Sequence, residues 1–138
     1  MNWILFVLLS LSSVSQAAIK SSYSLTMGHH SEATLYWQHR TVKNKNVFVI
    51  GYREAGRFPT EQVVPKDEFN KDVRELKDWR KKLIMKQSAM AGPACNETVL
   101  MSEDDGLIPV CLQGILKSEK TSFLRWYRKQ TDLVSGRL

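Results

Sequence analysis

Three histidines and a glutamate near the start of the chain are the residues whose types could hold a metal ion. His29, His30 and Glu32 fall in or beside a polar turn, and His39 follows on the next predicted strand. Neutral imidazole and carboxylate groups are ligands that Zn²⁺ accepts. Adjacent side chains on an extended segment point in different directions, so solvated turn histidines explain the pattern more simply. We therefore predict neither a metal site nor a cofactor.

The two cysteines, Cys95 and Cys111, are separated by 15 residues. In an oxidising compartment such a pair is most simply a disulfide. Closing a loop of this size stabilises a fold by about 3 kcal/mol in the chain-entropy model. The alternative, a thiolate metal site, lacks a second Cys or His pair at suitable spacing. The sequence therefore predicts one disulfide and no free thiol to act as a nucleophile.

Catalytic motifs are scarce. There is no Gly-x-Ser-x-Gly elbow, phosphate-binding glycine loop or His-Glu-x-x-His helix. Arg53, Glu54 and Arg57, next to Tyr52 and Phe58, could line a small polar pocket, and a salt-bridged loop is the interpretation that we favour. We assign no catalytic residue.

The C-terminal residues combine bases with aromatic side chains. Residues 115–138 contain six bases and two acids, and thus carry four of the chain's six net positive charges. Interleaved bases and aromatics suit anionic surfaces such as lipid headgroups, lipopolysaccharide or acidic glycans. Alternatively, the aromatics are core and the bases are the solvated back of the same helix. The candidate anion-binding residues are Lys120, Arg125, Arg128 and Lys129.

These residues need elements to position them. Alternating or β-branched residues predict strands at 23–27, 34–42 and 47–53, with 43–46 as a polar hairpin loop. Residues 54–65, punctuated by glycine and prolines, are expected to form a connection.

A helix is predicted over residues 66–87. Its apolar residues recur at helical spacing: Phe69, Val73, Leu76, Leu83 and Ile84. Acids fill its first half and bases its last turns, as the helix macrodipole favours. We interpret it as a surface helix whose basic end is a secondary binding candidate.

Two further strands, 96–101 and 107–113, are predicted around a turn with an Asp-Gly step, and a last helix over 118–134. Pro109 cannot donate a ladder hydrogen bond, which places its strand at an edge or a bulge. The order βββ-α-ββ-α predicts an α+β fold: a small antiparallel sheet with two helices packed on one face and one disulfide.

Residues 1–17 have the order of a cleavable signal peptide. An apolar run over 4–11 precedes a small-residue stretch that places the cut after Ala17. The run is too short for the roughly 20 residues that span a bilayer. Residues 18–138 then form a single compact domain without a transmembrane segment. One cysteine pair on a full core favours the periplasm over the extracellular space, and the sequon at Asn96 matters only in a eukaryotic secretory pathway.

Together these features predict an exported, soluble and basic binding or accessory protein of the cell envelope or extracellular space. Its partner is an anionic surface or a protein, whereas nucleic acid does not suit the compartment. A small secreted or periplasmic hydrolase is the first alternative, and a disulfide-braced structural or assembly subunit is the second. The sequence leaves the partner's identity and the oligomeric state open.

Overall fold

The computed structural model describes residues 18–27, 33–85, 97–103 and 106–135. A 3-10 turn, Leu112–Gly114, links the last strand to the last helix. The other elements, in chain order, are β1 Ala18–Met27, β2 Ala33–Val42, β3 Lys45–Glu54, β4 Thr60–Val63, α2 Lys66–Met85, β5 Thr98–Glu103, β6 Gly106–Cys111 and α3 Lys117–Ser135.

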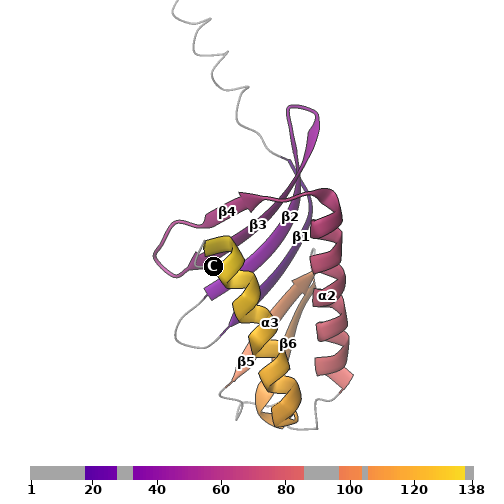
Figure 1. The fold of residues 1–138 in the computed structure, drawn as a ribbon, viewed down its shortest axis with the longest axis vertical. Helices are drawn as coiled ribbons and strands as arrows, with labels where there is room; N and C mark the ends of the chain where they lie inside the picture. Colours follow the sequence, from indigo (N-terminus) through magenta and orange to yellow (C-terminus); the bar gives the residue numbers. More distant parts are fainter. Residues whose placement is uncertain (1–17, 28–32, 86–96, 104–105, 136–138) are drawn as a thin grey trace, which may run out of the picture.

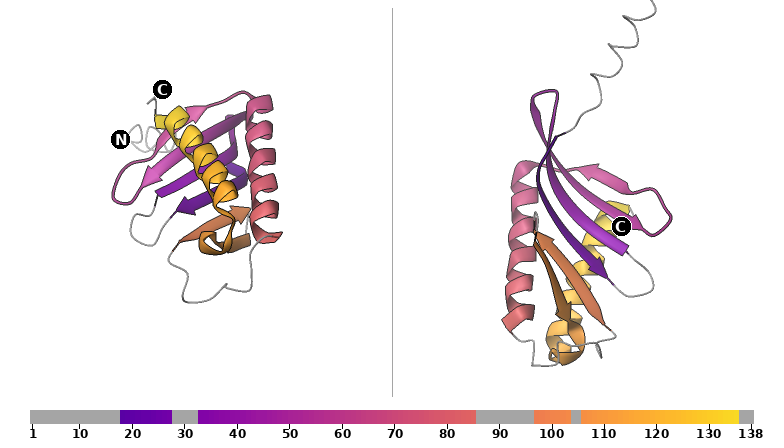
Figure 2. Two further views of the ribbon diagram at one scale, coloured as in Figure 1. Left: turned by 60° about the horizontal axis from the view of Figure 1, so that its bottom comes forward. Right: turned by 180° about the vertical axis from the view of Figure 1, so that it is seen from behind.

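The strands form one sheet in the order β4-β3-β2-β1-β5-β6, and every neighbouring pair is antiparallel. Both helices lie on the same face of this sheet (Figure 1). Figure 2 shows the opposite face, which no described element covers. The predicted α+β fold with an antiparallel sheet and two helices is therefore confirmed.

The β2–β3 hairpin is tighter than predicted. Its turn consists of Lys43 and Asn44 alone, with φ of 50° and 61°, and Val42 already pairs with Lys45. Two positive φ angles give a turn whose twist matches that of the flanking strands. The polar residues 45–46, expected in the loop, therefore belong to β3.

The connection predicted over 54–65 is wrong in one respect, because it contains β4. This strand pairs with β3 from Val49↔Val63 to Tyr52↔Thr60. All four of its residues are exposed. An exposed edge strand buries neither face, so it needs no alternation of apolar residues that the sequence could reveal. The element order is thus ββββ-α-ββ-α.

The core lies between the sheet and the helices. Its largest fully buried side chains are Trp37, Phe123, Leu25, Leu35, Leu83 and Met101. Four residues of the predicted α2 stripe, Phe69, Val73, Leu76 and Leu83, are buried as expected. Ile84 is 38% exposed. It lies about 100° around the helix from Leu83 and so falls outside the stripe.

β6 is an edge strand, as Pro109 predicts.

The predicted signal peptide and Cys95 lie outside the described residues, so the cleavage site and the Cys95–Cys111 disulfide stay predictions. Within the described ranges, neither helix has the length and apolar character needed to cross a bilayer.

Candidate functional site

The candidate site is the side of α3 that faces away from the sheet, and its opposite side fixes the helix in place. Phe123, Gln130 and Val134 are buried against the core. The ring of Trp126 stacks 6.0 Å from that of Trp37, and its Nε1 donates to Glu75 Oε2 of α2 at 2.8 Å. The aromatic side of α3 is thus held by both the sheet and the neighbouring helix.

The same side of α3 holds Tyr127, whose hydroxyl is buried without a hydrogen-bond partner among the described residues. Burial raises the pKa of Tyr127, and Tyr52 and Glu54 raise it further. The phenol therefore stays neutral, and its ring serves as packing surface.

Arg125, Arg128 and Lys129 are exposed on the outer side of α3. Within the described part of the chain, none of the three forms an ion pair. Asp132 follows Arg128 by four residues and so lies on the same side. Three bases and one acid leave this side with a positive balance.

Lys120 differs from the other three predicted residues. It forms an ion pair with Glu97, which lies just before β5. The pairing neutralises the charge of Lys120, so the structure narrows the candidate face to Arg125, Arg128 and Lys129. Glu97 and Lys120 meet only in the folded chain, and no sequence pattern connects them.

The metal candidates are only partly described. His29, His30 and Glu32 lie outside the described residues. His39 Nε2 lies 3.0 Å from Asn46 Oδ1, and the ring of His39 stacks on Phe48 at 4.5 Å. In the described ranges, no three His, Cys, Asp or Glu residues gather as a metal site requires.

The loop after β3 is salt-bridged, as we expected. Arg57 Nη1 lies 3.4 Å from Glu54 Oε2, and Glu54 also accepts a hydrogen bond from Tyr52. A hollow of about 110 Å³ is lined by Tyr52, Glu54, Arg57 and Phe58 among others. Arg53 does not line it. The hollow is small compared with ligand pockets of about 300–1,000 Å³.

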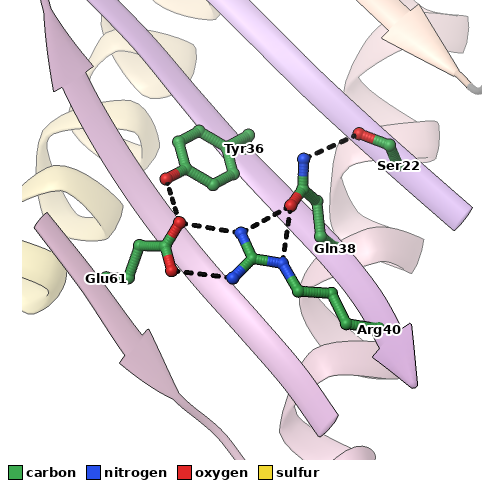
Figure 3. Close-up of polar contacts among 5 residues, drawn as sticks. All are labelled: Ser22, Tyr36, Gln38, Arg40 and Glu61. Carbon is green, nitrogen blue, oxygen red and sulfur yellow. Dashed lines mark hydrogen bonds and ion pairs between the residues drawn. The ribbon is translucent and has the colours of Figure 1, made fainter. Parts of the chain in front are cut away.

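A second polar cluster, which the sequence did not predict, lies on the open face of the sheet (Figure 3). Arg40 donates to both carboxylate oxygens of Glu61, at 2.8 and 2.7 Å. Tyr36 Oη donates to Glu61 at 2.6 Å, and Gln38 Oε1 accepts from Arg40 at 2.9 Å. The cluster joins β2 to β4 across β3.

Gly51 of β3 makes this crossing possible. A Cβ atom at residue 51 would lie 2.1 Å from Cζ of Tyr36, so the tyrosine ring occupies the space that a side chain would fill. The hydrogen bonds of Arg40 lower the pKa of Glu61. Burial, together with Glu61, raises the pKa of Tyr36 to about 12. The charges of Arg40 and Glu61 therefore balance within the cluster. Its hydrogen bonds connect β4 to β2.

No family model matches the chain, and neither a curated protein nor a solved structure does.

Proposed function

We propose that this chain is an exported, non-enzymatic binding or accessory protein of the cell envelope or extracellular space, and that α3 engages an anionic partner. The observation that supports this most is the division of α3 into two sides. Its aromatic side is fixed in the core, whereas Arg125, Arg128 and Lys129 are exposed. The export part of the proposal rests on the sequence of residues 1–17 alone.

Binding through three exposed bases is mainly electrostatic. Its affinity is modest, and it falls as salt shortens the ~10 Å Debye length that applies at 0.1 M. The helix is already ordered by its buried side, so binding costs little backbone entropy. Suitable partners present dense negative charge: anionic lipid headgroups, lipopolysaccharide or acidic glycans.

The test replaces Arg125, Arg128 and Lys129 together by Glu. Because the three side chains are exposed, each change should alter the free energy of unfolding by no more than about 0.5 kcal/mol. We expect the triple variant to lose retention on heparin, on anionic vesicles and on immobilised lipopolysaccharide at low salt.

A matched control makes the same change of net charge elsewhere. Lys45→Glu, Lys71→Glu and Lys81→Glu reverse three exposed bases on β3 and α2. This control should keep most of the parent's retention. If the two triple variants lose retention equally, binding follows net charge alone and α3 is not the site.

The Cys95–Cys111 disulfide belongs to the same proposal. Leu112 N donates to Glu97 O at 2.9 Å, so the residue after Cys111 lies beside a residue two positions from Cys95. Cys111 is 5% exposed, and no free cysteine occurs among the described residues. The intact mass of the exported protein should begin at Ala18 and lie two hydrogens below the reduced value. Thiol labelling of the native protein at Cys95 or Cys111 would contradict the disulfide.

A further inference from the structure

A larger hollow, of about 570 Å³, lies between α2 and the first three strands. On the helix it is lined by Lys66, Asn70, Arg74 and Lys77, which follow one another at intervals of three or four residues and so form one stripe. Glu75, which bonds to α3, lies on another side of α2. The hollow is therefore separate from the basic side of α3.

The charges that line this hollow are all positive. They come from Lys66, Arg74 and Lys77, and no Asp or Glu is among its described lining residues. Lys77 is partly neutralised, because its Nζ lies 3.3 Å from Glu103. The same Nζ lies 5.3 Å from the ring centroid of Tyr23. In the described ranges, Lys66 and Arg74 form no ion pair. Two cations thus face the hollow with their charge available.

The rest of the lining is aromatic and apolar. The ring of Phe48 contacts those of His39 and Phe69, with centroid distances of 4.5 and 5.1 Å. Phe69 and Val73 are buried and line the hollow. Tyr23 adds a further ring beside Lys77. The hollow therefore offers a ring surface next to unneutralised positive charge.

We propose that this hollow binds a small amphipathic organic anion, whose carboxylate, sulfonate or phosphate group lies at Arg74 and Lys66 and whose planar apolar part lies against Phe48 and Tyr23. The volume falls within the range of small-molecule sites. A guanidinium donates two parallel hydrogen bonds to such anionic groups. The site is independent of the function proposed for α3.

The probe is 8-anilinonaphthalene-1-sulfonate, an aromatic sulfonate whose fluorescence rises on binding. We expect saturable binding to the folded protein, weakened about tenfold or more by Arg74→Glu and by Lys66→Glu, since each change removes a charge-assisted contact. The matched control, Arg125→Glu on α3, should bind within about twofold of the parent. Binding of N-phenyl-1-naphthylamine, which lacks the sulfonate, should also be about tenfold weaker.

A measurement on the unmodified chain tests the proposal even where a variant fails to fold. In a nitrogen–proton correlation spectrum, the probe should shift the side-chain amides of Asn46 and Asn70, which line the hollow. The proposal is overturned if the probe shows no saturable binding, or if these amides do not move while others do. It is equally overturned if Arg74→Glu and Lys66→Glu both bind the probe like the parent, or if the uncharged amine binds as tightly as the sulfonate.

Discussion

At the scale of single residues, the least expected feature is a buried carboxylate in the first half of α2. Asp72 is 9% exposed. Its burial raises the pKa to about 6 from an ordinary 3.8, and Glu75 adds to the shift. The indole of Trp37 lowers the pKa of Asp72, by less than burial raises it. Its N–H makes no regular hydrogen bond among the described residues. The charged form of Asp72 is therefore disfavoured in the folded protein.

This shift in pKa predicts that Asp72→Asn raises the free energy of unfolding by an amount that depends on pH. The folded state keeps the Asp72 proton to a higher pH than the unfolded chain, so this group lowers stability as pH rises from about 4 to about 6. The amide cannot ionise. We expect Asp72→Asn to raise the free energy of unfolding by about 1–2 kcal/mol at pH 7.5 and by little at pH 4.

Denaturant unfolding at the two pH values measures the effect. The control is Asp78→Asn, which removes an exposed acid from the same helix. An equal effect of Asp72→Asn at both pH values would show that burial does not raise the pKa of Asp72.

Gly51 gives a second prediction at this scale. An alanine there would push the Tyr36 ring away from β3 and break its hydrogen bond to Glu61. We expect Gly51→Ala to lower the free energy of unfolding by about 1–2 kcal/mol. In a Tyr36→Ala background the same change should cost much less, because the obstructing ring is gone. A double-mutant cycle that shows no coupling would contradict this account.

How far the sequence predicts single residues depends on whether their partners are local. The burial of Phe123, Gln130 and Val134 follows from helical spacing within one segment. The pairing of Arg40 with Glu61 does not, since it depends on β4 lying two strands away from β2. The burial of Asp72 could not be predicted either, because the same helix carries exposed acidic residues.

At the scale of elements, β4 is a short edge strand whose hold on the sheet depends on side chains. Glu61 binds Arg40 and Tyr36 on the open face. On the helical face, Gln62 Nε2 donates to Val134 O of α3 at 3.3 Å. The strand has no buried side chain of its own, so these polar contacts take the place of apolar packing.

Glu61→Gln should therefore loosen β4 selectively. The amide keeps some hydrogen-bonding capacity but loses the charge that attracts Arg40, and charge-assisted bonds are the stronger ones. We expect amide hydrogen exchange of the β3–β4 ladder to speed up about tenfold, with the β1–β5 ladder unchanged. Glu68→Gln, at an exposed position of α2, is the control. Uniform acceleration across the sheet would mean that the cluster stabilises the whole fold rather than β4.

The elements also show where prediction from sequence ends. Five of the six strands and both helices were predicted from local signals: apolar spacing in the helices and β1, β-branched and aromatic residues in β2 and β3, and the Asp-Gly turn between β5 and β6. β4 buries nothing and was missed. The open face of the sheet carries Ser, Thr and Gln side chains, and the contacts across it were not predicted.

At the scale of the whole molecule, the protein is a one-layer sheet covered on one side by two helices (Figures 1 and 2). Six net positive charges are spread over the chain, and four of them come from residues 115–138. The fold turns three of the bases in that segment, Arg125, Arg128 and Lys129, to the outside of α3. We propose that an anionic partner binds to this side of α3.

The most direct test locates that contact on the unmodified protein. A nitrogen–proton correlation spectrum is recorded while a short heparin oligosaccharide is added at low salt. We expect shifts concentrated on the amides and guanidinium N–H groups of Arg125, Arg128 and their neighbours on α3. These shifts should disappear at about 0.5 M salt, where the Debye length is about 4 Å. Saturable shifts centred on another element, with α3 unaffected, would contradict the proposal.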